Sequence, residues 1–309
     1  MVKGPAVPPI ALVLGAVVSV QFGGALAVFL LPLIGVLGSV ALRLTLAAVI
    51  LAIAVRPALT GRSGRDWLVV TGFAVALTAM NLAFYGSLAR LPIGVAVTIE
   101  FLGPLALAAF LSRRLSDGVA VVAALAGVVL ISEVLSSSWA DIDLLGVGLA
   151  LLAGVGWAAY IVASGKTGAR FSGLDGIAIC LLAGTALMIP VMTLASLAGG
   201  LSVPAEVFLS REVLALGLAV ALLSSAVPYS LELLALRQLS AGVFGVLLSL
   251  EPAVAALAGL LLLGQRLDPA QLGGMALVVS ASIVVLGRPR APATATRASW
   301  PGGDGGTIS

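Results

Sequence analysis

Histidine is absent from this sequence, cysteine occurs once, and charged residues are scarce. Without histidine, the protein has no imidazole to serve as a metal ligand, a proton relay or a general base. The single cysteine, Cys180, cannot form an intramolecular disulfide or a cysteine metal cluster, and we expect it to pack as a small apolar residue. These absences exclude most active sites and metal centres, so we expect no metal, no cofactor and no enzymatic activity.

Charged residues make up only 9% of the 309 residues, whereas hydrophobic residues make up 61%. A soluble domain carries roughly 25% charged residues, so this chain lacks the polar surface that would keep it in water. Apolar runs of about 20 residues, long enough to cross the hydrocarbon core of a bilayer, recur along the chain. The formal net charge of +3 comes from arginines in loops and offers no extended basic surface for nucleic acid. We therefore predict an all-α polytopic membrane protein whose main partner is the lipid bilayer.

Charged residues and clusters of Gly, Pro and Ser divide the chain into ten apolar segments, and each segment predicts a transmembrane helix. The segments cover approximately residues 9–31, 35–55, 67–89, 92–112, 118–135, 143–164, 174–198, 212–236, 240–264 and 269–287.

The first segment has two interpretations. Lys3, the apolar run from Ile10 and the small residues at 25–27 resemble a signal peptide with a cleavage site. The run continues through Leu31 without a polar region, which favours a retained first helix. At the other end, residues 289–309 are rich in Pro, Ala, Thr and Gly, a composition typical of a disordered tail.

Lysines and arginines orient the predicted helices. With the N-terminus in the cytoplasm, twelve of them fall in inside segments, whereas only Arg90, Arg211 and Arg266 fall in outside loops. The acidic loop at 133–143 contains no Lys or Arg and falls outside. This bias agrees with the positive-inside rule, so we predict that both termini are cytoplasmic.

The chain contains a weak internal repeat with an offset of 148 residues. The stretch LARLPIGV at 88–95 resembles LRQLSAGV at 236–243, and the same offset superposes Pro104 on Pro252. Two copies of five helices must enter the membrane from opposite sides. We therefore predict an inverted repeat, the architecture of many secondary transporters, whose sites lie near the midplane. The two predicted repeats are residues 1–140 and 141–288.

Two ionisable residues, Arg43 and Glu100, lie inside apolar segments. Each is about eight residues into a helix that descends from the outside, so we expect the two at similar depth, where an ion pair can form. A single charge near the centre of a membrane helix costs roughly 2.5–3.5 kcal/mol. A static pair that joins two helices is the structural alternative. Ionisable groups within membranes are functional by default, and we favour that interpretation.

Prolines interrupt the helices near carboxylates. Pro104 frees the backbone carbonyl of Glu100, four residues earlier, and Pro252 directly follows Glu251, the carboxylate of the second repeat. A carbonyl released within lipid needs a protein, water or substrate partner. Kinks that serve packing would explain the prolines alone, but their combination with carboxylates favours a site.

The eighth predicted helix carries a proline within a polar face. Pro228 frees the carbonyl of Ser224, and Ser225, Tyr229 and Glu232 share one side of the helix. Glu232 falls within about one turn of the cytoplasmic end, where hydration is sufficient to explain it.

Other polar side chains also lie within the predicted helices. Asn81 and Tyr85 share one face of the third helix, and the repeat offset matches Asn81 to Tyr229. Tyr160 lies on a polar face of the sixth helix, and Gln21 is a lone amide in the first. Small polar residues often only join helices, for about 0.6 kcal/mol. We interpret Asn81 and Tyr229 as the better candidates for contact with a solute. For Thr78, Trp157 and Ser164 we expect only a structural or interfacial role.

Several stretches resemble a known family. EPAVAALAGLLLLGQRL at 251–267 is similar to the second repeat of the EamA-type branch of the drug/metabolite transporter superfamily. MNLAFYGSLARLPIGVAVTIEFLGPLALAAFLSRR at 80–114, LSSAVPYSLELLALRQL at 223–239 and GVFGVLLSLEPAVAAL at 242–257 resemble its bacterial inner-membrane exporters of threonine and homoserine. The resemblance covers all but the tail. Gln265 departs from the family pattern, which often has an acid there, and we expect this to affect an outer loop.

The resemblance implies export of small amino acids across the bacterial inner membrane in exchange for protons. A broader metabolite or drug exporter of the same family is the alternative, and the oligomeric state stays open. An amino acid would place its carboxylate on Arg43 and its ammonium group on Glu100 or Glu251, and one of these two carboxylates would exchange the coupled proton. The expected substrate-binding residues are Gln21, Arg43, Asn81, Tyr85, Glu100, Tyr160, Tyr229 and Glu251.

Overall fold

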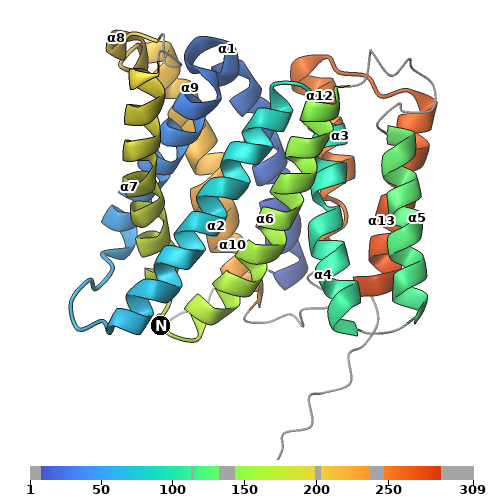
Figure 1. Ribbon diagram of the computed structural model, residues 1–309, viewed down its shortest axis with the longest axis horizontal. Helices are drawn as coiled ribbons and strands as arrows, with labels where there is room; N and C mark the ends of the chain where they lie inside the picture. Colours follow the sequence, from blue (N-terminus) through green and yellow to red (C-terminus); the bar gives the residue numbers. More distant parts are fainter. Residues whose placement is uncertain (1–7, 113–114, 132–142, 199–202, 237–246, 287–309) are drawn as a thin grey trace, which may run out of the picture.

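The computed structural model contains helices and no strands in the residues that it describes, which agrees with the predicted all-α class. Most of the helices run side by side between two edges of the molecule (Figure 1). The predicted tail, 289–309, and most of the acidic loop lie outside the described residues. The described residues are 8–112, 115–131, 143–198, 203–236 and 247–286.

The described helices follow the order of the predicted segments. They are α1 (Pro9–Val55), α2 (Gly64–Leu88), α3 (Ile93–Glu100), α4 (Leu102–Ser112), α5 (Leu115–Ile131), α6 (Leu144–Gly168), α7 (Asp175–Leu197), α8 (Ala205–Phe208), α9 (Arg211–Ala221), the π-helical turn η1 (Leu222–Ala226), α10 (Val227–Leu236), α12 (Glu251–Leu263) and α13 (Pro269–Leu286).

α1 contains both of the first two predicted segments. Its backbone leaves the helical conformation at Gly35, where φ is 66° and ψ is 179°, a region that is essentially restricted to glycine. Pro32, three residues earlier, also lacks the N–H of a regular helix. The helix is therefore kinked between the segments predicted at 9–31 and 35–55.

Two other boundaries differ from the predicted ones for local reasons. α2 begins three residues early because Ser63 and Asp66 form a capping box: Ser63 Oγ accepts a hydrogen bond from the Asp66 N–H at 3.2 Å, and Asp66 Oδ2 accepts one from the Ser63 N–H at 3.0 Å. The predicted segment 92–112 is divided into α3 and α4 at Phe101, three residues before Pro104.

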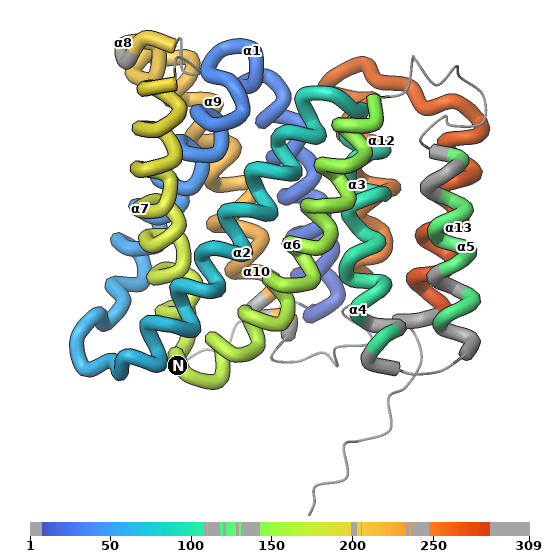
Figure 2. The backbone as a smooth tube through the Cα atoms, viewed as in Figure 1, coloured from blue at the N-terminus to red at the C-terminus, as the bar shows by residue number. Residues whose placement is uncertain are grey.

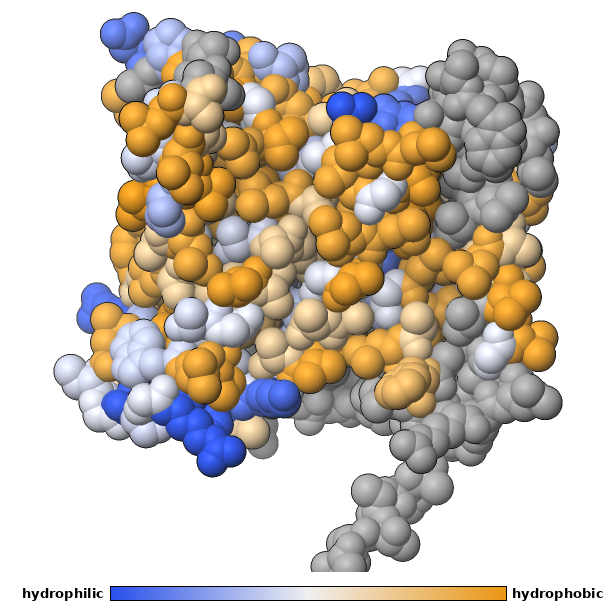
Figure 3. Space-filling view, in the orientation of Figure 1, coloured by the Kyte–Doolittle hydropathy of each residue, from blue (hydrophilic) through white to orange (hydrophobic). Residues whose placement is uncertain are grey.

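The surface between the two edges is apolar. Figure 3 shows hydrophobic residues across this face and hydrophilic residues mainly near the edges. Midway along the helices, Val155 of α6 is 65% exposed and Ile189 of α7 is 64% exposed. Such exposure suits contact with lipid. By length and composition, five described helices could cross a membrane: Pro9–Val55, Gly64–Leu88, Leu144–Gly168, Asp175–Leu197 and Arg211–Glu232; the shorter apolar helices are Ile93–Leu107, Glu251–Leu263 and Pro269–Val284.

Helices that are far apart in the sequence pack side by side. α2 lies along α6, and α5 lies along α13 (Figures 1 and 2). α1 packs against α7, α9, η1 and α10, and α3 packs against α6 and α12. The largest core cluster joins α1, α2, α7 and α9, where Leu30, Leu44, Leu77 and Leu181 are almost completely buried. The interior is therefore built from both halves of the chain.

Two glycines bring the break between α3 and α4 into backbone contact with α6. A Cβ atom added to Gly103 would lie 1.9 Å from the carbonyl oxygen of Gly154, and one added to Gly154 would lie 2.6 Å from the carbonyl oxygen of Glu100. Neither distance leaves room for a side chain. Small residues are the usual means by which membrane helices approach this closely.

We expect Gly154→Ala to destabilise the protein by about 1–3 kcal/mol, because its methyl group would overlap the Glu100 carbonyl. Gly148→Ala is the matched control, because this glycine belongs to the same helix and an added Cβ would meet no atom within 4 Å. Thermal unfolding of the purified protein in detergent measures both variants. Equal melting temperatures would contradict the close approach.

Asp143 caps the first turn of α6 and connects it to the end of α2. Its Oδ1 accepts a hydrogen bond from the Gly146 N–H at 2.7 Å, and its Oδ2 lies 3.0 Å from Arg90 Nη1. The hydrogen bond from Gly146, assisted by the Arg90 charge, holds the pKa of Asp143 below its ordinary value of 3.8. A carboxylate with a lowered pKa stabilises the folded protein in its ionised form.

The contribution of Asp143 should therefore be complete above about pH 5 and should be lost as the pH falls through the lowered pKa. We expect Asp143→Asn to melt below the wild type at about pH 6 and to approach it as the pH falls through the lowered pKa of Asp143. Arg90→Gln removes the ion pair but keeps the negative charge of Asp143 at the N-terminus of α6, so it should have the smaller effect. If the difference in melting temperature between the wild type and Asp143→Asn did not change with pH, stabilisation by the ionised Asp143 carboxylate would be excluded.

Candidate functional site

Arg43, in the second half of α1, is the centre of a buried polar cluster. Its Nε donates to Ser225 Oγ at 3.1 Å, its Nη2 donates to the carbonyl oxygen of Ser224 at 2.8 Å, and its Nη1 donates to Asn81 Oδ1. The guanidinium carbon lies 5.6 Å from the centre of the Tyr85 ring, within the range of a cation–π contact. Arg43 is only 6% exposed, so these partners are what make its burial tolerable.

The Ser224 carbonyl is available because the regular helix is interrupted there. The turn η1 is π-helical, and Pro228 has no N–H to donate to the carbonyl four residues earlier. Arg43 is the partner of this carbonyl. The neighbouring carbonyl of Leu223 accepts a hydrogen bond from Ser19 Oγ at 2.7 Å. Side chains of α1 thus satisfy two carbonyls of the irregular turn.

Gly23 lets α1 come close enough to make these bonds. A Cβ atom added to Gly23 would lie 2.3 Å from Ser224 Oγ and 2.8 Å from the Ser224 nitrogen. Any side chain at this position would push η1 away from α1 and lengthen the bonds across the interface.

Three buried hydroxyl groups in or next to the cluster have no hydrogen-bond partner among the described residues: those of Thr78, Tyr85 and Ser224. Thr78, Asn81 and Tyr85 occupy one face of α2 and are each at most 5% exposed. The Asn81 amide nitrogen is held by its own helix, which leaves its oxygen for Arg43. An unsatisfied buried hydroxyl costs about 1–3 kcal/mol. The cluster therefore has unused capacity to bind water or a polar solute.

Glu100, the last residue of α3, lies near the cluster without joining it. It is 7% exposed, and its charge is close enough to that of Arg43 for electrostatic interaction. The two are not paired, because the ion pairs within 4.0 Å among the described residues all lie at helix ends and include neither residue. The ion pair that their expected equal depth would allow is therefore not formed. Arg43 is turned instead toward Asn81 and η1.

A second buried polar contact joins α1 to α12. Gln21 Nε2 donates to Glu251 Oε2 at 3.2 Å, and both side chains are at most 5% exposed. The α-helical pattern is interrupted at 249–250, so α12 begins at Glu251 and Pro252 lies in its first turn, where a missing N–H does no harm. The lone amide of the first predicted helix therefore has a carboxylate partner.

Tyr160 and Tyr229 belong to an aromatic cluster between α2, α6 and α10. Their ring centres lie 6.3 Å apart with the planes 26° from parallel, and the Phe73 ring centre lies 5.1 Å from that of Tyr160. Both tyrosines are within electrostatic range of Arg43. The same rings line a cavity of about 100 Å³ together with Glu232.

Glu251 lies within electrostatic range of two other carboxylates. Glu251 interacts with both Glu100 and Glu232. In a low dielectric, the ionisation of one of these carboxylates disfavours the ionisation of its neighbours. In the described part of the chain, no group of three metal-ligating side chains is placed to hold a metal ion.

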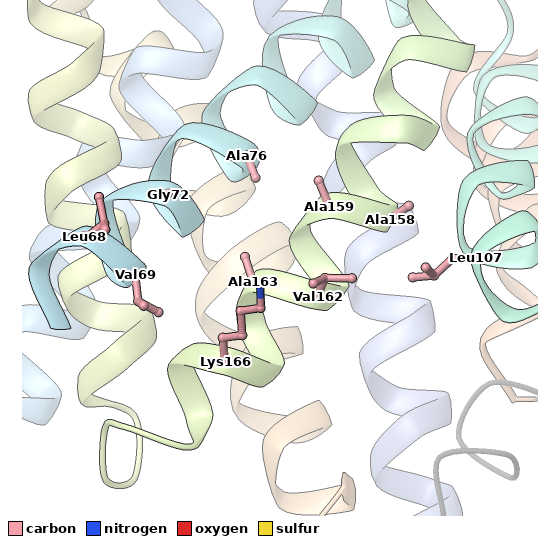
Figure 4. Close-up of a pocket in the computed structure, with 10 residues that line it drawn as sticks. All are labelled: Leu68, Val69, Gly72, Ala76, Leu107, Ala158, Ala159, Val162, Ala163 and Lys166. Atoms are coloured by element: carbon pink, nitrogen blue, oxygen red, sulfur yellow. The ribbon is translucent and has the colours of Figure 1, made fainter. Parts of the chain in front are cut away.

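A larger groove, of about 540 Å³, runs along the outer faces of α2 and α6 (Figure 4). It is lined by leucine, valine, alanine and glycine, with Lys166 as its charged side chain, and Figure 4 shows Ala76, Ala159 and Ala163 along it. An exposed apolar groove of this kind suits lipid better than a polar solute. We therefore assign the candidate site to the Arg43 cluster.

Sequence reasoning does not single out every residue of the site. The sequence explains Thr78 by helix contacts and Glu232 by hydration, and it places Ser225 only on a polar face. Thr78 and Ser225 nevertheless lie in or next to the Arg43 cluster, and Glu232 lines the cavity. Pro228 does indicate a buried polar contact in this region, because the carbonyl that it releases, that of Ser224, needs a partner nearby.

Gln265, the departure from the family pattern, reaches beyond its loop. Its Oε1 accepts a hydrogen bond from the N–H of Ile93, the first residue of α3, at 3.1 Å. It therefore caps the helix whose other end carries Glu100. The departure from the family pattern at this position therefore concerns the start of α3 as well as the outer loop.

Comparison with known proteins gives a consistent result. Residues 144–287 match the EamA-like transporter family. The chain is 40% identical over 281 residues to the threonine/homoserine exporter RhtA of Escherichia coli K12. The alignment covers 91% of this chain and 92% of that protein. RhtA of Salmonella typhimurium LT2 is 37% identical with the same coverage. A solved protein structure aligns with a TM-score of 0.59 at 22% identity, over 90% of this chain and 97% of that one; this likeness concerns the fold alone.

Proposed function

This chain belongs to the EamA-like transporter family, and on that premise we propose that it is a secondary active exporter of small amino acids of the threonine and homoserine kind. The observation that carries the proposal is the unused hydrogen-bonding capacity around Arg43. The 40% identity to proteins named threonine/homoserine exporters supports the same substrate class.

Arg43 retains the donors that an amino-acid carboxylate needs. A guanidinium has five N–H groups, and Arg43 donates three of them to protein, one each from Nε, Nη1 and Nη2. The two that remain belong to Nη1 and Nη2. These neighbouring nitrogens can bind both oxygens of a carboxylate in a bidentate pair.

The other groups of the substrate would be bound by the surrounding residues. Glu100 would accept hydrogen bonds from the ammonium group, because it lies near Arg43 and is not paired with it. The unpaired hydroxyls of Thr78 and Tyr85, with Asn81 and Tyr229, would bind the hydroxyl of the substrate side chain. Gln21, Tyr160 and Glu251 would line the rest of the path.

The helices would form two inverted five-helix repeats, residues 1–140 and 141–288. In chain order, α2 and α9–α10 are the third helices of the two repeats, and the first stretch of α1 corresponds to α6. The contact of α1 with α9–α10 therefore corresponds to the contact of α6 with α2. The other two contacts, α3 with α12 and α5 with α13, each join a helix of one repeat to the equivalent helix of the other. This pattern supports an approximate twofold relation, with the site at the repeat interface.

The protein would lie in a bacterial inner membrane with both termini in the cytoplasm. Arg62, Lys166 and Arg170 lie where α1 leads into α2 and where α6 leads into α7, and hydrophilic residues gather along this edge in Figure 3. The positive-inside rule assigns such an edge to the cytoplasm. The cavity beside Glu232, lined by the turn between α6 and α7, would then open on the cytoplasmic side.

Export would proceed by alternating access, with the repeats rocking around Arg43. A proton would bind Glu100 when the site has released its amino acid outside, and would leave on the cytoplasmic side before the next ammonium group binds. Glu251 would be the second carboxylate of the coupling group. We assign the exchange to Glu100 because it is the one near Arg43.

We expect proteoliposomes that contain the wild type to show counterflow of labelled L-threonine and L-homoserine. Arg43→Lys keeps the charge but loses the bidentate geometry, so KM should rise about 30- to 150-fold, equivalent to about 2–3 kcal/mol. Arg90→Gln is the control for an arginine outside the site. Equal transport of unrelated metabolites or drugs would favour the broader exporter, and an unchanged KM in Arg43→Lys would exclude the assigned role.

Glu100→Gln should separate coupling from binding. The amide can still accept a hydrogen bond from the substrate ammonium but cannot exchange a proton, so counterflow should persist at a reduced rate while accumulation driven by a pH gradient is lost. Glu206→Gln, at an exposed position in α8, is the matched control. Uphill export by Glu100→Gln at the wild-type rate would rule out this residue as the proton carrier.

A further inference from the structure

The cavity between α2, α6, α7 and α10 is distinct from the Arg43 cluster. Its wall includes Phe73, Tyr160, Ser164, Tyr229 and Glu232, and the rest comes from the end of α6, the following turn and the start of α7. None of the residues that accept hydrogen bonds from Arg43 lines it. Its volume of about 100 Å³ is well below the roughly 300–1,000 Å³ of a drug-sized pocket, so it suits a small group.

Glu232 gives this cavity a negative charge without a resident cation. It is the one charged side chain in the cavity wall, and no ion pair among the described residues includes it. The nearby arginines of the α1–α2 and α6–α7 connections, Arg62 and Arg170, are already paired with Asp175 and Asp66. A half-buried carboxylate in a recess attracts cations, because low-dielectric walls focus its field.

The aromatic rings beside Glu232 favour an organic cation over a metal ion. Tyr160 and Tyr229 are stacked, and Phe73 packs against Tyr160. Ring faces attract ammonium groups, and quaternary ammonium sites in other proteins are built in this way. A single carboxylate among rings offers far fewer oxygens than the six to eight that Ca²⁺ takes. The hydroxyl of Ser164, in the same wall, can accept a further hydrogen bond from an ammonium N–H.

We propose that the cavity at Glu232 is a separate binding site for a primary ammonium group. Resting on the proposed function, the inference extends to transport: an amino acid first binds here through its ammonium group, and the stacked pair Tyr160 and Tyr229 separates this entry site from Arg43. Both tyrosines are in electrostatic range of Arg43 and of Glu232, which is consistent with a position between the two.

The site can be tested without transport by cysteine labelling. The only native cysteine, Cys180, is buried, so Ser164→Cys supplies an accessible thiol inside the cavity. A thiolate is negative and reacts faster with a cationic reagent than with an anionic one wherever it lies, so the preference is measured against a control thiol. Ser172→Cys, exposed on the α6–α7 turn and outside the cavity wall, is the matched control. We expect the ratio of the rates of a trimethylammonium and a sulfonate methanethiosulfonate reagent to be about ten times larger at Ser164→Cys than at Ser172→Cys, and ethylammonium to slow the reaction at Ser164→Cys.

Adding Glu232→Gln to Ser164→Cys should return the rate ratio to that of Ser172→Cys and abolish the protection by ethylammonium, whereas Glu232→Asp should retain the larger ratio and the protection. Elution of each variant as a single peak in size exclusion shows that it is folded. A rate ratio that stays above that of Ser172→Cys in Glu232→Gln, or a ratio at Ser164→Cys that equals that of Ser172→Cys from the start, overturns the site.

Transport measurements distinguish the ammonium site at Glu232 from the proposed export function. Glu232→Gln should raise KM for L-threonine about tenfold and leave the counterflow rate at saturation nearly unchanged. An unchanged KM overturns the entry role. Charge-selective labelling in a protein that moves no amino acid would instead retain the ammonium site and overturn the proposed export function.

Discussion

The hydrogen bond from Arg43 to the carbonyl of Ser224 connects the two structural irregularities on which the site depends. A buried guanidinium without acceptors and a helix carbonyl without a donor are each costly within a membrane. Here each satisfies the other, while Asn81 attaches the same guanidinium to α2. The contact thereby fixes α1, α2 and η1 to one another. Because it engages only part of the guanidinium, the interaction that stabilises the interior also leaves donors for a ligand.

Features that depend on the local sequence could be predicted well. Apolar length and charged breaks give the succession of helices, and the missing N–H of Pro228 identifies a free carbonyl four residues earlier. The all-α class and the family follow from composition and from several quoted stretches. The Ser63–Asp66 capping box, which starts α2 before the apolar run, was also readable in the sequence but belongs to the solvated end of the helix.

The partners of the buried polar groups could not be predicted in the same way. Equal spacing from one surface predicts that Arg43 and Glu100 lie at one level of the membrane, but it does not fix the rotation of either helix about its axis. That rotation is set by long-range packing, including the absence of side chains at Gly103 and Gly154. The pairing of Gln21 with Glu251 likewise depends on which helices are neighbours. Glu232 lies near a helix end in the sequence, and only the fold places it against a cavity.

The proposed inverted repeat would relate the helices of the two halves but not their carboxylates. The offset of 148 pairs Glu100 with Leu248, so Glu251 lies three residues further along and on the other side of the helix interruption. Glu100 lies near Arg43, whereas Glu251 is bound by Gln21 of α1. A carboxylate that binds Arg43 changes the charge beside Glu100 directly, and it affects Glu251 only through Glu100. In the proposed mechanism, an approximately twofold architecture would therefore support an asymmetric coupling site, because binding at Arg43 would act first on one carboxylate.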